Sequence, residues 1–133
     1  RTPLHLASAN GHADVVRFLI RKNCQLNLAD NFKRSPLMKA VQCQQEECVA
    51  VLLKHGADPN LADADGNTAL HLAVLSPNTA VAGLLLEHNA NTDAQNQDGY
   101  TPLNLALFKH HEEMVELLQR KGADGQAPDQ RER

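Results

Sequence analysis

The sequence predicts an all-α fold, a solenoid of four 33-residue helix-turn-helix units joined by hairpin-like loops. Within the 133 residues, the chain resembles itself at a period of 33, and a helix-start motif and a helix-end residue both recur in phase. A fixed period of this size is typical of solenoids, in which each unit buries its apolar face against its neighbours. The repeats run without insertion or deletion over 2–34, 35–67, 68–100 and 101–133.

Each unit opens with a motif that starts a helix. Thr or Ser stands at the N-cap, where its side-chain oxygen accepts an N–H of the first turn, and Pro follows in three of the units. A Leu comes next, and an Ala three residues later allows a neighbouring helix to approach closely. The openings are Thr2–Ala7, Ser35–Ala40, Thr68–Ala73 and Thr101–Ala106.

A second, amphipathic helix follows in each unit. Acidic residues such as Asp14 and Glu46 stand near its start, where the helix dipole is positive. Its spacing of apolar residues predicts a wide face that packs in the core, Phe18 included. In the first unit this face consists of Val15, Val16, Phe18, Leu19 and Ile20.

The expected end of each second helix is marked by Asn or Gly. These two residue types tolerate the left-handed conformation that commonly follows the last helical residue. They recur 33 residues apart at Asn23, Gly56, Asn89 and Gly122. We therefore expect all four second helices to end just before these positions.

Polar loops with a glycine at the turn, such as Gly66 and Gly99, predict hairpin-like projections between the units. The fourth loop departs from this pattern from Gly125 onward. We therefore expect an array over residues 1–124 and a frayed or disordered tail over 125–133.

These motifs resemble the ankyrin repeat, over essentially the whole chain. The resemblance implies a helix, a turn, a second helix and a hairpin in each unit. Two family features are incomplete: the glycine between the helices survives only as Gly11, and the structural His of the first helix is replaced by Met38 and Asn104. The segments Lys39–Cys48 and His55–Leu61 resemble the POTE-type group of mammalian ankyrin-repeat proteins, which place such arrays beside coiled coils.

Composition argues against several classes of partner. The formal net charge of −3 is opposite to the basic surface that nucleic acids and acidic membranes require. The longest apolar run, Ala80–Leu86, is too short to cross a bilayer. The three cysteines favour an intracellular location, in the cytoplasm or the nucleus. Because the chain begins inside a motif, we expect another unit upstream in a longer protein.

No catalytic, cofactor or metal site is predicted. Cys43 and Cys48 are spaced unlike the cysteine pairs of structural zinc sites, and Cys24 and Cys48 replace small apolar residues of other units, so we expect both in the core. The Asp63–Gly66 segment lacks the carboxylates that a calcium loop needs at both ends. The sequence also contains no phosphate-binding loop and no nucleophile elbow, so the chain is not expected to be an enzyme.

The ankyrin resemblance implies a binding surface at the hairpin tips and at the ends of the first helices. Aromatic residues and Arg, which often anchor interfaces, are concentrated there. The alternative is that Tyr100 and Phe108 merely pack against each other between adjacent hairpins. The predicted partner-binding residues are Asn10, Asn31, Phe32, Arg34, Asp65, Asn67, Leu75, Asp98, Tyr100, Phe108 and Lys109.

The sequence therefore predicts a non-catalytic protein–protein interaction module without a cofactor, a nucleic-acid partner or a membrane partner. The alternative is a structural spacer or self-association element within a longer, coiled-coil-containing protein. The family resemblance also implies a third role, as a substrate hydroxylated at Asn27 or Asn60.

Overall fold

The computed structural model describes residues 2–126. These residues form helices joined by turns and loops, without a β-strand among them, so the predicted all-α fold is confirmed. Among the described helices, none has both the length and the apolar character needed to cross a bilayer. The helices are α1 (Pro3–Asn10), α2 (Ala13–Arg21), α3 (Pro36–Gln42), α4 (Glu46–Lys54), α5 (Ala69–Leu75), α6 (Thr79–Glu87), α7 (Pro102–Phe108) and α8 (Glu112–Gln126).

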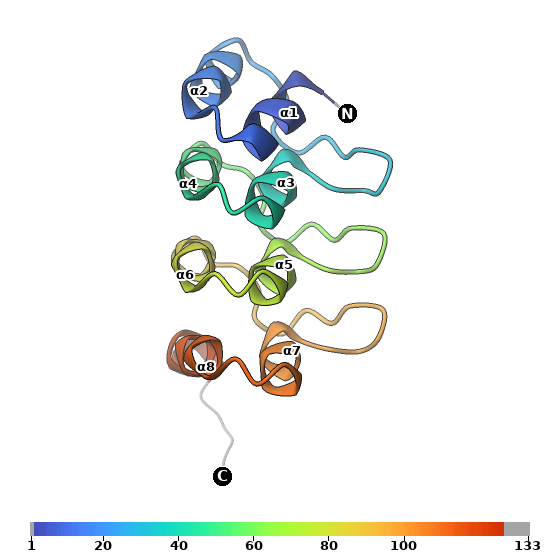
Figure 1. Ribbon diagram of the computed structural model, residues 1–133, viewed down its shortest axis with the longest axis vertical. Helices are drawn as coiled ribbons and strands as arrows, with labels where there is room; N and C mark the ends of the chain where they lie inside the picture. The colour runs from blue at the N-terminus through green and yellow to red at the C-terminus, as the bar shows by residue number, and fades with distance from the viewer. Residues whose placement is uncertain (1, 127–133) are drawn as a thin grey trace.

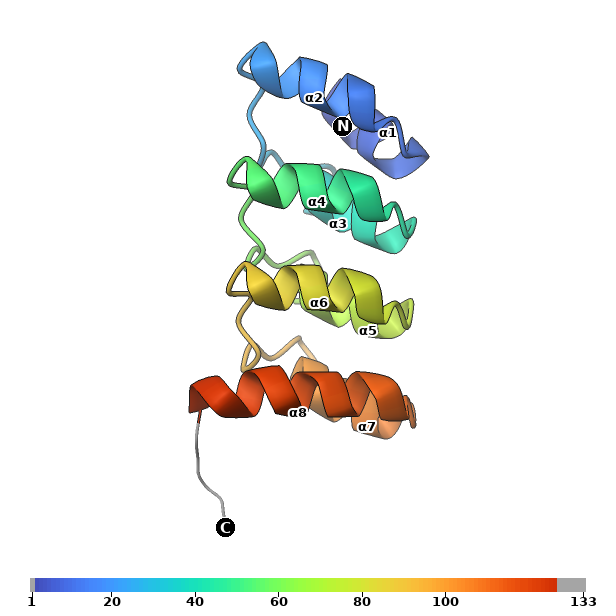
Figure 2. The same ribbon diagram turned by 90° about the vertical axis from the view of Figure 1, so that its left-hand side faces the viewer.

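The helices stack in two parallel columns (Figure 1). The inner column contains α1, α3, α5 and α7, and the outer column contains α2, α4, α6 and α8; each helix packs on the next one in its own column. Figure 2 shows the outer column in front of the inner one, with α8 extending beyond the others. The loops between successive pairs all project to the same side of the inner column, away from the outer helices.

The predicted N-caps are all present. Thr2, Ser35, Thr68 and Thr101 precede the inner helices in extended conformation. Each side-chain oxygen accepts a hydrogen bond from the N–H three residues later, over 3.1–3.5 Å. The inner helices therefore begin at the same point of every repeat, which places the loops before them in register.

The turn between the two helices of a pair uses the left-handed conformation in three of the four pairs. Gly11, Gln44 and His110 have φ values of 78°, 57° and 60°. Pro77 stands at the fourth such turn, and its ring cannot adopt a positive φ. There the following residue, Asn78, caps α6 by accepting a hydrogen bond from the Val81 N–H over 3.1 Å.

Three of the four predicted ends of the outer helices are confirmed. Asn23, Gly56 and Asn89 follow α2, α4 and α6 with φ values of 66°, 96° and 67°. The prediction for Gly122 is wrong, because α8 continues through it to Gln126. Glycine permits the left-handed conformation but does not impose it. Residues 125 and 126 belong to this helix, and the rest of the segment expected to be frayed lies outside the described residues.

The core consists of small and branched apolar side chains between the columns and between successive helices. Cys48 is fully buried, as predicted, and its burial raises the pKa of its thiol. The core positions predicted for Val15, Phe18 and Cys24 are wrong: Val15 is 45% exposed, Phe18 is 49% exposed and Cys24 is exposed. Their equivalents Cys48, Val51 and Ala57 lie inside the stack. All three errors lie in the first repeat, where no preceding pair of helices in the described chain covers these positions.

Candidate functional site: the groove between hairpins and inner helices

Three hairpins project beside the inner helices, and we define them by residues 30–34, 63–67 and 96–100. Each is closed by a backbone hydrogen bond of 2.9–3.0 Å between its first and last residues. In each, the first side chain, from Asp30, Asp63 or Asn96, accepts hydrogen bonds from two N–H groups of its own hairpin. Hydrogen bonds from the backbone to this first side chain thus hold each hairpin tip, and they fix the positions of the other tip residues.

Two buried histidines, His71 and His5, each tie one hairpin to an inner helix. The N–H of Thr68 donates to Nδ1 of His71 over 3.0 Å, so the ring proton is on Nε2, which donates to the Tyr100 carbonyl over 2.8 Å. His5 makes the equivalent bond to the Arg34 carbonyl, also over 2.8 Å. Burial lowers the pKa of His71, which keeps the ring neutral.

Neighbouring hairpins are also bonded to each other. The Ala64 N–H donates to the Phe32 carbonyl, and the Gln97 N–H donates to the Asp65 carbonyl, over 2.9 and 3.0 Å. A Cβ on Gly66 would lie only 2.8 Å from the Gln97 nitrogen, so a glycine is needed where these two hairpins meet. The hairpins therefore form one continuous ridge.

An ion pair reinforces the first part of this ridge. Arg34 Nε lies 3.5 Å from Oδ2 of Asp63, whose side chain is almost completely buried. Neither atom has another hydrogen-bond partner among the described residues. The Arg34 guanidinium also lies 5.4 Å from the centre of the Phe32 ring, within range of a cation–π interaction.

The cavity that we call the first-hairpin groove lies between the first hairpin and helices α1 and α3 and has a volume of about 280 Å³. Its apolar lining comes from Leu6, Ala9 and Phe32. The charged groups are Arg34 and Lys39 against one carboxylate, Asp30. Partial burial raises the pKa of Asp30, but hydrogen bonds from the Arg34 and Phe32 N–H groups and the charge of Lys39 lower it by more, so the net shift is downward and this carboxyl stays ionised.

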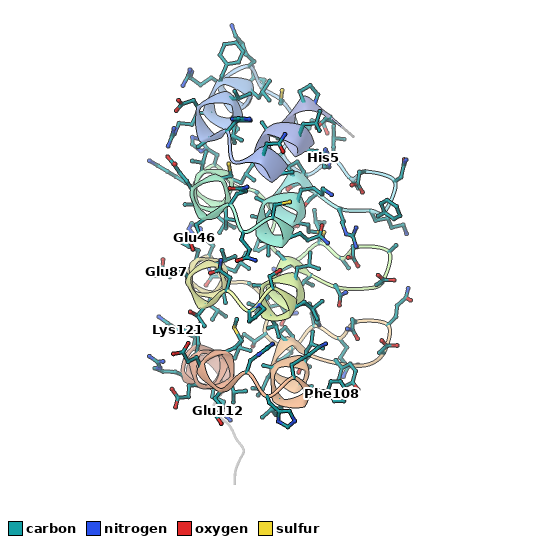
Figure 3. All side chains as sticks on the ribbon, in the orientation of Figure 1. His5, Glu46, Glu87, Phe108, Glu112 and Lys121 are labelled. Atoms are coloured by element: carbon teal, nitrogen blue, oxygen red, sulfur yellow. The ribbon has the colours of Figure 1, made fainter. Side chains whose placement is uncertain are left out.

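A second apolar area lies on α7. Phe108 packs against Tyr100 with ring centres 5.7 Å apart and planes inclined by 31°. Tyr100 is half-buried, whereas Phe108 remains 63% exposed. Figure 3 shows Phe108 on the side of the inner column from which the hairpins project. The two aromatics thus pack together, as the alternative interpretation expected, yet most of the Phe108 ring remains accessible to a partner.

Most of the predicted partner-binding residues are exposed, but two, Asn67 and Arg34, have structural roles. Asn67 is half-buried, and its side-chain oxygen accepts a hydrogen bond from Asn96 Nδ2 over 2.9 Å. Arg34 also makes structural contacts, through its pair with Asp63. The exposed members of the predicted set are Asn10, Asn31, Phe32, Asp65, Leu75, Asp98, Phe108 and Lys109.

Five groove residues lie outside the predicted partner-binding set, namely His5, Ala9, Asp30, Leu6 and Lys39, and the last two are the most informative. They occupy equivalent positions of successive inner helices, and the later equivalents are Leu72 and Leu105, both buried. Leu6 is 51% exposed in the groove, and Lys39 carries a charge where the other repeats have leucine. This departure from the repeat pattern was visible in the sequence and could have identified Lys39.

Titratable groups elsewhere do not gather into a reactive centre among the described residues. No three His, Cys, Asp or Glu side chains there lie close enough to hold a metal ion. Asn27 and Asn60 each accept a hydrogen bond through the side-chain oxygen from the next loop, over 2.9 and 2.7 Å. Both asparagines thus support the stacking of the loops, and their hydroxylation stays a prediction.

Comparison with known proteins agrees with this architecture. The family described as "Ankyrin repeats (3 copies)" matches residues 1–63 and residues 57–129. The chain is also similar to "Ankyrin repeat domain-containing protein 7" of Homo sapiens, with 72% identity over 25 residues. That alignment spans 19% of this chain and 10% of the relative. Since the family match extends over nearly all the described helices, the chain belongs to the ankyrin-repeat family.

Proposed function

We propose that this protein binds a partner protein through the hairpin tips and the adjacent face of the inner helices. Ankyrin repeats generally mediate protein–protein interaction and are generally non-catalytic scaffolds. The observation that carries the proposal for this chain is the exposure of two phenylalanines on one face: Phe32 is 62% exposed and Phe108 is 63% exposed. The core, by contrast, buries its leucines and alanines.

Energetic reasoning supports the same face. Aromatic side chains bury a large area on binding and lose few torsional degrees of freedom, so they commonly dominate interface energies. The hydrogen bonds of the hairpins and their histidine tethers hold the surface in place before the partner arrives. A preorganised surface loses less conformational entropy on binding.

The experiment compares partner capture by two folded variants. We expect the Phe32→Ser, Phe108→Ser double variant to lose proteins that the wild type retains from a cell lysate, measured by quantitative mass spectrometry. The control, Glu87→Ser, Lys121→Ser, changes two exposed residues of the outer column (Figure 3), and we expect it to retain them. Retention by both variants, or equal loss from both, would refute the assignment of the binding face.

Self-association is the second candidate, and a different observation favours it. Val15 and Phe18 are exposed at one end of the described stack, and Leu107 is exposed at the other. A contact between such unlike ends is head-to-tail and does not close, so it would produce a series of growing oligomers rather than a dimer. Sedimentation over a hundredfold range of concentration distinguishes the two candidates, with Leu107→Asp as the variant that should restore a single species. A single concentration-independent species for the wild type would remove this candidate.

A further inference from the structure

We infer that the first-hairpin groove receives, from the partner protein, an extended segment in which a carboxylate side chain stands next to an apolar one, and that Lys39 pairs with the carboxylate. This inference rests on the proposed function and specifies the chemistry of the partner. It follows from the shape of the groove, from its charges and from the position of Lys39 in the repeat pattern.

Lys39 is the groove cation that no carboxylate of the described side chains contacts directly, although its charge acts on Asp30 and lowers the pKa of that carboxyl. Arg34 is engaged by Asp63 and lies over the Phe32 ring. Among the residues whose side chains the structure describes, no ion pair joins Lys39 to a carboxylate. The groove carboxylate, Asp30, accepts two backbone N–H groups through Oδ1. Lys39 is partly buried in a cavity with apolar walls, and an anion stabilises an ammonium better than apolar walls do, so the site favours a partner carboxylate.

An apolar side chain is expected beside that carboxylate. Leu6 and Phe32 form exposed walls of the same cavity, next to Lys39. The volume of about 280 Å³ lies just below the range for small-molecule sites, which is roughly 300–1,000 Å³. A cavity of this size fits a few side chains from a polypeptide better than a whole cofactor.

Charges farther along the ridge restrict the partner to a protein segment with limited acidity. Asp65 and Asp98 are exposed on the second and third hairpins, so each hairpin beyond the groove presents a carboxylate to the partner. A nucleic acid would place its phosphates against these carboxylates, and a polyacidic peptide would place its own carboxylates there, so both would be repelled. The segment that fits has its acidic residue at the groove and neutral or basic residues beyond it.

The test selects peptides from a phage library of random sequences about twelve residues long, which span about 40 Å when extended. Wild type, Lys39→Leu, Lys39→Glu and Lys54→Glu are used in parallel. Lys39→Leu introduces the residue that the other repeats carry, so it retains the inner-helix pattern. Lys54→Glu makes the same charge change as Lys39→Glu but on an exposed position of the outer helix α4, which makes it the matched control.

We expect wild type and Lys54→Glu to enrich peptides with Asp or Glu within one or two positions of Leu, Ile or Phe. Lys39→Glu should lose this preference for acidic residues. For one synthetic peptide of this kind, Kd should increase about fivefold in Lys39→Leu and tenfold or more in Lys39→Glu, and it should change less than twofold in Lys54→Glu. Replacing the acid of the peptide by its amide should remove the difference between wild type and Lys39→Leu.

Two outcomes would overturn the inference, and they are distinguishable. The role of Lys39 is refuted if the enriched peptides show no preference for acidic residues, or if Lys39→Glu selects peptides with the same preference. The proposed function still holds in that case if the peptides no longer bind the Phe32→Ser, Phe108→Ser variant. If no peptide is enriched by the wild type, the inference fails, and the proposed binding face fails for peptide segments as well.

Discussion

The imidazole of His71 is held between two backbone groups, receiving the Thr68 N–H at Nδ1 and donating from Nε2 to the Tyr100 carbonyl 2.8 Å away. This contact joins the start of α5 to the end of the third hairpin, 29 residues later in the sequence. It requires a neutral ring, because a protonated Nδ1 could not accept the Thr68 N–H. The position of the third hairpin therefore depends on the protonation state of His71.

We predict that acidification destabilises the protein partly through His71. Burial lowers its pKa below the value of about 6.5 in the unfolded chain. Between these two pKa values the unfolded state binds the proton and the folded state does not. The stability that the neutral His71 contributes is therefore fully present above the unfolded pKa and is lost as the pH falls through the folded pKa. One proton contributes a slope of at most about 1.4 kcal/mol per pH unit.

Urea unfolding between pH 7.5 and pH 5 measures this effect. His71→Asn, which introduces the residue that the fourth repeat carries as Asn104, should retain the N-cap and show a smaller loss of stability on acidification. Thr101 and Asn104 already make this amide version of the cap. An unchanged pH dependence in the variant would exclude His71 as the titrating group.

Opposite effects are expected at the two turns with Gly11 and Gln44. Gly11→Ala should destabilise the protein by about 1 kcal/mol or more, because the residue has a φ of 78° and its new Cβ would lie 2.5 Å from Oε1 of Gln45. Gln44→Gly should stabilise it by up to about 1 kcal/mol, because Gln44 has a φ of 57° without being a glycine. Thermal unfolding followed by circular dichroism checks both. A gain from Gly11→Ala would contradict the described turn.

The pair of Arg34 and Asp63 allows a double-mutant cycle. Arg34→Leu should cost about 1–3 kcal/mol, because it leaves Oδ2 of Asp63 buried without its partner. Asp63→Asn should cost less, since Asn96 holds the third hairpin with the same two hydrogen bonds. In the Asp63→Asn background, the cost of Arg34→Leu should decrease. Additive effects in chemical denaturation would show that the ion pair contributes no coupling energy.

The exposed phenylalanines should contribute little to the stability of the isolated protein. Phe32→Ser and Phe108→Ser should each change the free energy of unfolding by less than about 1 kcal/mol, because most of each ring is already in water. Leu70→Ser is the control: its side chain is completely buried, and the variant should lose several kcal/mol. A large loss at Phe32 or Phe108 would assign that ring to the core.

Local features of the fold could be predicted from sequence, because each depends on residues close together in the chain. The N-caps at Thr2 and Ser35 and the left-handed residues Asn23 and Gly56 were found in this way. The wrong prediction at Gly122 shows the limit of such rules, since a glycine allows a helix end but leaves the choice to its surroundings.

Burial and the binding face required the packing of distant segments. Phe18 has the apolar spacing of a core residue, but its exposure depends on whether another helix covers it. Asn67 has the sequence position of a free tip residue, but its side chain accepts a hydrogen bond from Asn96, 29 residues away. The first-hairpin groove likewise combines α1, α3 and a hairpin. Among the groove residues outside the predicted set, Lys39 has a local signal in the sequence, because it departs from the repeated leucine.

Site-specific photo-crosslinking tests the central claim most directly. A photoreactive phenylalanine analogue is placed at position 32 or 108 on the proposed binding face, or at position 87 on the outer column, and each protein is irradiated in lysate. The proposed binding face predicts crosslinks to the same partner protein from positions 32 and 108 and none from position 87. Crosslinks to that protein from position 87 alone would contradict the proposal and move the interface to the outer helices.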